Sequence, residues 1–127
     1  MTATLEALTT ATLALALDAA SRRQQAIAAN VANVNVEGFQ ALRLDFESQL
    51  AQARDSLQRG GSVEARDLAA VQLELQPEVD EAGLPARVRL DVEMAEMARN
   101  AVQYQALAQG LTRHFGMLAA AAGDGRK

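Results

Sequence analysis

The sequence contains no cysteine and no tryptophan, and only three phenylalanines and one tyrosine among its 127 residues. Without cysteine the chain can form no disulfide, no thiolate zinc site and no cysteine nucleophile. Its two prolines, Pro77 and Pro85, both lie in the middle, so proline interrupts neither end of the chain. Alanine and leucine supply most of the apolar half of the composition, and both favour helix. The composition therefore predicts long, closely packed helices rather than a compact enzyme core.

Basic stripes and long apolar runs are also absent. The formal net charge is −4, and the arginines are scattered among carboxylates, which argues against nucleic acid as a partner. No run of 18 apolar residues is free of charge, so we expect a chain that is not inserted in a membrane. The N-terminal stretch lacks the basic start and cleavage site of a secretory signal. We therefore expect a cytoplasmic protein, or one that leaves the cytoplasm without a cleaved signal.

Residues 2–35 contain neither proline nor glycine and predict one long helix. Two apolar sets lie along it, with centres roughly 120° apart at 100° per residue. One partner helix could cover either set but not both. We therefore expect either a helix buried in a larger core or a helix with two partners, of which one can belong to another subunit. The first set is Leu13, Leu17, Ala20, Gln24, Ile27, Val31 and Val34, and the second is Leu5, Leu8, Leu15 and Ala19.

Residues 91–122 predict a second long helix, followed by a flexible tail over residues 123–127. Apolar residues recur along it at steps of four and three without an exception, which is typical of a coiled-coil seam of about four heptads. The series is Leu90, Met94, Met97, Ala101, Tyr104, Ala108, Leu111, Phe115 and Leu118.

The middle of the chain differs in character from its ends. Helical spacing predicts a short helix over residues 43–58, which Gly60, Gly61 and Ser62 then break. Apolar and polar residues alternate over residues 71–76 and again over 87–92, on either side of a turn at residues 80–83. These two runs predict a weak β-hairpin, or a disordered loop, since two strands alone are marginally stable.

Candidate catalytic residues are few. His114 is the only histidine, and it lies on the flank of the predicted seam, where a solvated helix residue is the ordinary interpretation. Glu93 and Glu96 complement the dipole at the start of the last helix. No cluster of histidine and carboxylate offers a catalytic metal site. The sequence therefore predicts no enzyme, no cofactor and no small-molecule substrate.

Three asparagines crowd the end of the first predicted helix. Asparagine is a good C-terminal cap, so a helix stop explains Asn35. Asn30 and Asn33 instead continue the second apolar set in polar form, and a polar residue in a seam can fix register. A helix stop and a register-setting role both remain open for these two residues.

This stretch resembles the signature of flagellar basal-body rod and hook proteins, in which the first helix ends in a pattern like Asn-x-Ala-Asn-x-x-Thr-Pro-Gly-Tyr. Val36 and Glu37 stand where the family has Thr-Pro, so the entry to the turn lacks its proline. Residues 45–50 and, more closely, residues 91–107 resemble the FlgB branch of that family. The matching signature positions are Asn30, Ala32, Asn33, Gly38 and Phe39.

The resemblance implies a single mostly α domain over residues 1–127. It would comprise a helix and motif (1–37), a variable middle (38–89), a C-terminal helix (90–122) and the tail, with the two terminal helices packed as a coiled coil. It implies a structural subunit of the flagellar rod, exported by the flagellar type III route without signal cleavage and needed for motility. Implied partners are FliE, FliF, FlgC, FlgF and copies of the chain itself. A soluble coiled-coil adaptor or export chaperone that forms a closed dimer is the alternative.

Overall fold

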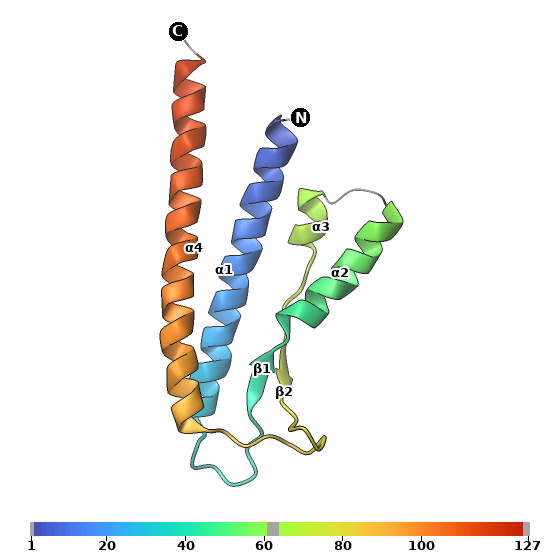
Figure 1. Ribbon diagram of the computed structural model, residues 1–127, viewed down its shortest axis with the longest axis vertical. Coiled ribbons are helices and arrows are strands. Elements are labelled where there is room, and N and C mark those ends of the chain that lie inside the picture. The colour runs from blue at the N-terminus through green and yellow to red at the C-terminus, as the bar shows by residue number, and fades with distance from the viewer. Residues whose placement is uncertain (1, 61–63, 126–127) are drawn as a thin grey trace.

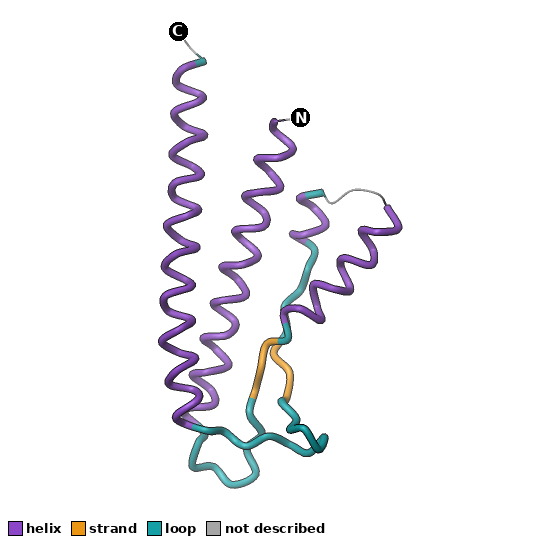
Figure 2. The backbone as a smooth tube through the Cα atoms, viewed as in Figure 1, coloured by secondary structure: helices purple, strands orange, loops and turns teal. Residues whose placement is uncertain are grey.

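The computed structural model describes residues 2–60 and 64–125, and two long helices dominate it (Figures 1 and 2). The terminal helices lie side by side, and a short helix and a small antiparallel strand pair lie between them in sequence, so the predicted fold class is confirmed. The elements in chain order are α1 (Thr2–Ala32), β1 (Leu42–Leu44), α2 (Phe46–Gly60), α3 (Ala65–Ala69), β2 (Leu75–Pro77) and α4 (Leu90–Asp124).

The ends of the long helices differ slightly from the prediction. α1 stops at Ala32, before the predicted end at Asn35, because residues 33–38 form successive turns. Gly38 has a φ of 80°, a conformation that glycine adopts without strain. α4 runs past the predicted end at residue 122, and Gly125 closes it with a backbone hydrogen bond to Ala121. The rest of the predicted flexible tail, residues 126 and 127, lies outside the described residues.

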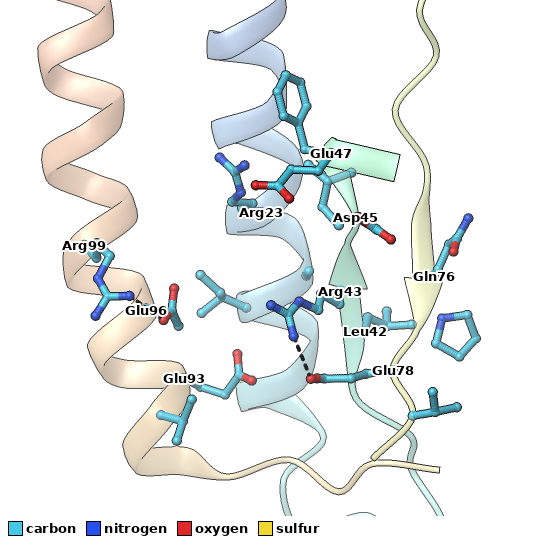
Figure 3. Close-up of a pocket in the computed structure, with 17 residues that line it drawn as sticks. Arg23, Leu42, Arg43, Asp45, Glu47, Gln76, Glu78, Glu93, Glu96 and Arg99 are labelled. Carbon is cyan, nitrogen blue, oxygen red and sulfur yellow. Dashed lines mark hydrogen bonds and ion pairs between the residues drawn. The ribbon is translucent and has the colours of Figure 1, made fainter. Parts of the chain in front are cut away.

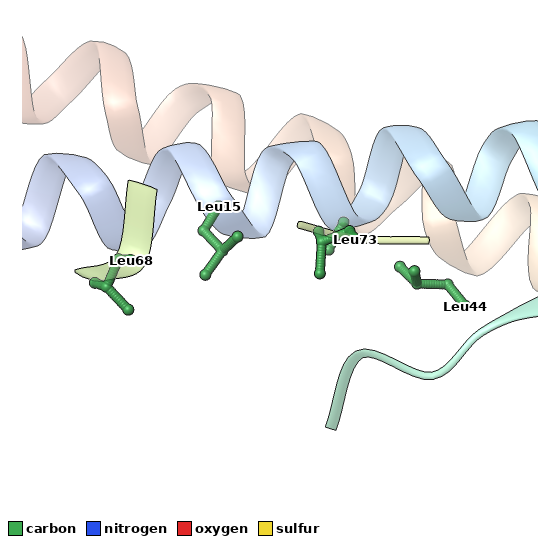
Figure 4. Packing of buried hydrophobic residues seen from close by; sticks show 5 residues of the cluster. Leu15, Leu44, Leu68 and Leu73 are labelled. Atoms are coloured by element: carbon green, nitrogen blue, oxygen red, sulfur yellow. The ribbon is translucent and has the colours of Figure 1, made fainter. Parts of the chain in front are cut away.

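α1 packs on two sides, as its two apolar sets predict. α4 lies along one side, where Leu13 comes within 4.0 Å of the position that a side chain at Gly110 would occupy. The middle of the chain lies on the other side, and Leu15 and Ala19 join the buried core there (Figure 4). Both partners of α1 therefore come from its own chain. The other core residues are Leu44, Leu68 and Leu73.

The predicted hairpin is wrong in its pairing. β2 pairs with β1 and not with residues 87–92, and Arg43 lies opposite Gln76 in the antiparallel register. Residues 90–92 begin α4 instead, because the apolar period of the long helix prevails over the short alternation that precedes it. The turn at residues 80–83 is present, with the Asp80 carboxylate accepting hydrogen bonds from the N–H groups of Ala82 and Leu84.

The predicted short helix begins later than expected. Its first residues are used by β1, and α2 starts at Phe46, where the carboxylate of Asp45 accepts a hydrogen bond from the N–H of Ser48. The helix includes Gly60, the first residue of the predicted break, while residues 61 and 62 lie outside the described residues. α3 is a five-residue helix that the sequence pattern did not predict.

Candidate assembly surface

Asn30 joins the end of α1 to the first strand. Its side chain is 1% exposed, its Oδ1 accepts a hydrogen bond of 2.8 Å from the N–H of Leu42, and its Nδ2 donates one of 3.0 Å to the C=O of the same residue. These backbone groups point away from β2, so the amide takes the place of a neighbouring strand. Asn30 therefore holds β1 against α1.

Asn33 ends the helix. Its Nδ2 donates a 2.7 Å hydrogen bond to the C=O of Ala29, one turn earlier, and its own N–H also bonds that carbonyl at 3.1 Å. Both bonds go to one carbonyl in the last turn of the helix, where carbonyls lack the usual partners further along the helix. Of the other signature residues, Ala32 is exposed and Phe39 is half-buried beyond the turn.

Gln49 repeats in the middle of the chain what Asn30 does at the end of α1. Its Oε1 accepts a 2.9 Å hydrogen bond from the N–H of Glu74, and its Nε2 donates a 2.8 Å bond to the C=O of that residue. The segment leading into β2 is thus held to α2 by a side-chain amide. Two bidentate amides therefore fasten the small strand pair to the helices around it.

The face that α4 turns toward α1 is centred on Asn100, the one α4 residue among those described that is buried. Nδ2 of Asn100 donates a 2.9 Å hydrogen bond to the C=O of Ala20, and Oδ1 has no partner within the described residues. At 100° per residue this face lies about a sixth of a turn from the predicted seam. The half-buried residues that flank Asn100 along the helix are Met97, Leu107, Leu111, His114 and Leu118.

The predicted seam is therefore divided between two faces, which corrects the sequence analysis. Its members Met97, Ala108, Leu111 and Leu118 are half-buried. Its other members are exposed, because within the described residues α1 is the one element that packs closely along α4, and it covers a single side. We call these other members the α4 ridge: Leu90, Met94, Ala101, Tyr104 and Phe115.

His114 also differs from its prediction as a solvated flank residue. It is half-buried on the contact face, and its Nε2 lies 3.1 Å from the hydroxyl oxygen of Thr10 on α1. This polar contact links the two helices far from Asn100. Within residues 2–60 and 64–125 no three histidine or carboxylate side chains come together as metal ligands.

The α4 ridge is an apolar feature that the fold leaves uncovered on one helix face. Tyr104 and Phe115 are each about half exposed, and Met94 is exposed to the same degree. Contiguous exposed apolar surface marks protein or ligand contacts more often than catalysis. The arrangement can therefore bind another helix along α4. No helix in the described part of the chain combines the length and apolarity needed to cross a membrane.

A groove of about 800 Å³ opens near the start of α4, between that helix, α1 and the strand pair (Figure 3). Glu93 lines it, and burial raises the pKa of this carboxyl above its ordinary value. A polar contact with the side chain of Asn30 lowers that pKa, and the nearby carboxylates of Glu78 and Glu96 raise it. The groove thus places a partly desolvated acid beside apolar walls.

Comparison with known proteins gives consistent matches. Residues 11–40 match a family model described as "Flagella basal body rod protein", and this range includes the asparagine signature. "Flagellar basal body rod protein FlgB" of Escherichia coli (strain K12) and that of Shigella flexneri are each 32% identical over 103 residues, covering 71% of this chain and 75% of the relative. The protein of that name from Yersinia ruckeri is 30% identical over 107 residues, with the same coverage.

Proposed function

The chain belongs to the FlgB family of flagellar basal body rod proteins, and from this premise we propose that it assembles into the proximal rod through its two terminal helices. Membership makes it a structural subunit of the flagellar rod, located in the basal body. The observation that supports assembly through the helices is the α4 ridge, which the single chain leaves exposed.

The physical argument for assembly is that α4 leaves large apolar side chains exposed that a neighbouring helix could bury. A fully buried large apolar side chain stabilises by about 1.5–3 kcal/mol relative to an exposed one. Three large residues of the ridge, Met94, Tyr104 and Phe115, are only half covered by their own chain. A neighbouring helix laid along the ridge would bury them, and a rod supplies many such helices in parallel.

Other rod components are the partners that family membership implies. Within the proposal these are FliE, FliF, FlgC, FlgF and further copies of this chain. Export takes place by the flagellar type III route without signal cleavage, and the assembled protein is needed for motility. Asn30, Asn33, Gly38 and Phe39 serve assembly indirectly, because they set the end of α1 and the path of the chain into β1.

A ridge variant tests the proposal. Tyr104→Asp with Phe115→Asp places two carboxylates on the ridge, where a docked helix would bury them without partners. We expect the variant to be secreted normally but to fail to restore swimming on soft agar in a strain that lacks the gene. Ala70→Asp with Gln72→Asp adds the same two charges at exposed positions in the middle and should swim normally.

The alternative of a closed-dimer adaptor or chaperone predicts a different outcome. An adaptor would remain in the cytoplasm and would keep a single dimeric mass on dilution. A rod subunit should be recovered in purified basal bodies. Normal swimming by the ridge variant, with wild-type amounts of protein in basal bodies, would show that the ridge is no assembly surface.

A further inference from the structure

α4 carries a second outward stripe in addition to the ridge. Positions 102, 106, 113 and 117 are separated by four, seven and four residues, so they share one face of the helix. Val102 and Met117 are 69% and 65% exposed, the largest values among the big apolar residues of α4. Arg113 lies between them, exposed and with no ion pair within the described residues. We call Val102, Ala106, Arg113 and Met117 the Arg113 stripe.

The groove at the other end of α4 has complementary chemistry. Its walls include the apolar side chains of Ile27, Leu44, Val79 and Val92, contributed by α1, β1, the turn segment and α4. A volume of about 800 Å³ accommodates several side chains. The groove can therefore receive a short length of an apolar helix face.

Carboxylates outnumber cations in the lining of the groove, which holds Asp45, Glu47, Glu78, Glu93 and Glu96 against Arg23, Arg43 and Arg99. Arg43 pairs with Glu78 at 3.1 Å, and Arg99 pairs with Glu96 at 3.0 Å. Glu93 points into the groove between these pairs and has no ion pair within the described residues (Figure 3). The nearest charges that influence its titration are both acidic. A basic side chain entering the groove would therefore neutralise Glu93.

We propose that the groove of one copy receives the Arg113 stripe of a second copy, with Arg113 pairing with Glu93 and Met117 packing against the apolar walls. This contact rests on the proposed function and deepens it, because it specifies one interface between rod subunits. The Arg113 stripe suits the groove in both charge and shape. The groove has more carboxylates than arginines and offers apolar walls. The same chain presents, between exposed apolar residues, an arginine that has no ion pair within the described residues.

The proposed contact is heterologous, since the groove and the stripe are different surfaces of the chain. Glu93 and Arg113 are separated by twenty positions on one helix, which is roughly 30 Å at 1.5 Å per residue. Two copies with parallel helices would then be displaced by about that distance along the axis. Heterologous contacts of this kind continue from copy to copy and build open helical assemblies rather than closed dimers.

The absence of cysteine makes a cross-linking test specific. Val79→Cys lies in the groove and Met117→Cys on the stripe, and both positions are exposed in the single chain. The two full-length variants are expressed together in a strain that lacks the gene, and basal bodies are isolated and oxidised. We expect a disulfide-linked dimer that contains residues 79 and 117, and none from either variant alone. Ala70→Cys, exposed in the middle, is the control and should form no dimer with Met117→Cys.

A charge exchange tests the ion pair within that contact. Glu93→Arg and Arg113→Glu should each lower the yield of the 79–117 dimer at least about tenfold, the effect of 1.4 kcal/mol. The double variant should restore most of it. The neutral variants Glu93→Gln and Arg113→Gln, which disturb folding less, should give intermediate yields. Arg87→Glu reverses an exposed charge elsewhere and should leave the yield unchanged.

The possible outcomes separate this contact from the broader function. Basal bodies that contain the protein but yield no 79–117 dimer would overturn the contact and leave the rod function intact. Links of 79 to 79 or of 117 to 117 would overturn it in favour of a closed, symmetric pair. Failure of the wild-type chain to enter basal bodies at all would instead overturn the proposed function. A double charge variant that forms no dimer, although both single variants fold, would exclude the Glu93–Arg113 pair.

Discussion

The side-chain amide of Asn100 donates a hydrogen bond of 2.9 Å to the backbone carbonyl of Ala20, across the interface between the two terminal helices. Asn100 is 5% exposed and Ala20 is fully buried, so this is a polar contact inside an apolar interface. Alanine at position 20 leaves its carbonyl accessible to a side chain from the facing helix. Sliding α4 by one turn would break this hydrogen bond, and we infer that the contact helps to fix the register of the two helices.

Replacing Asn100 should loosen that register more than it changes stability. Asn100→Leu loses a hydrogen bond worth about 0.5–1.5 kcal/mol but also removes a buried acceptor without a partner, an opposing effect of about 1–3 kcal/mol. We expect the free energy of unfolding to change little. Distances between spin labels on α1 and α4 should broaden, whereas Gln103→Leu, at an exposed position on the same helix, should leave them narrow. A single sharp distance in Asn100→Leu would show that apolar packing alone sets the register.

Removing the Asn30 amide should destabilise the fold. Asn30→Ala leaves the N–H and C=O of Leu42 without their side-chain partners in a partly buried position, and an unsatisfied buried group costs about 1–3 kcal/mol. We expect a loss of about 2 kcal/mol in the free energy of unfolding by urea. Asn35→Ala, at an exposed turn position, should change it by less than about 0.5 kcal/mol. Equal effects of the two substitutions would contradict the tether between α1 and β1.

The Glu93 carboxyl should make stability depend on pH in a definite direction. Burial raises its pKa in the folded chain, so the folded state holds this proton more tightly than the unfolded state does. Its contribution is therefore most favourable below the ordinary glutamate value of 4.5 and is lost as pH rises through the folded value. Glu93→Gln should accordingly stabilise the chain at pH 7, with a difference from the wild type that shrinks on acidification.

Urea unfolding at several pH values measures this effect. The other charged side chains that line the groove remain in place in the variant: Arg23, Arg43, Asp45, Glu47, Glu78, Glu96 and Arg99. Glu81→Gln, on the exposed turn, provides the control and should follow the wild-type pH profile. A variant Glu93→Gln that is less stable than the wild type at pH 7 would mean that the carboxylate is stabilised by a cation instead.

Export should leave the N-terminal residues in place. The flagellar type III route that we propose does not cleave its substrates, so export should remove no N-terminal residues. Mass spectrometry of the protein in purified basal bodies should find peptides that begin at Met1 or Thr2. Loss of fifteen to thirty residues, the length of a signal peptide, would refute this route.

The sequence by itself determined the two long helices, the two-sided packing of α1 and the family. Residues 2–32 contain no helix breaker, and two apolar sets a third of a turn apart require two partners whatever those partners are. The asparagine signature and residues 91–107 carry the family resemblance in local sequence alone. These features depend on neighbours within a few positions, and the chain encodes them directly.

Only the tertiary structure decided which face of α4 meets α1. Alanine, leucine and methionine occur around most of α4, so apolar periodicity defines its core side poorly. The face of α4 that packs on α1 is the one that contains Asn100 and Gly110. Asn100 donates a hydrogen bond to the carbonyl of Ala20 there, and Gly110 lies against Leu13. The sequence did not predict the role of Asn100, because nothing near a single asparagine in the sequence indicates a hydrogen-bond partner eighty residues away.

The pairing of the strands was also beyond the sequence. The alternation of apolar and polar residues indicates that residues 71–76 suit a strand, but it does not identify the strand with which they pair. β2 pairs with residues 42–44 because Asn30 and Gln49 anchor these two segments to α1 and α2. Such contacts join residues far apart in the chain, and the apolar periodicity of a single segment does not predict them. Local periodicity thus fixed the helices, while long-range hydrogen bonds and close packing fixed the faces and partners they use.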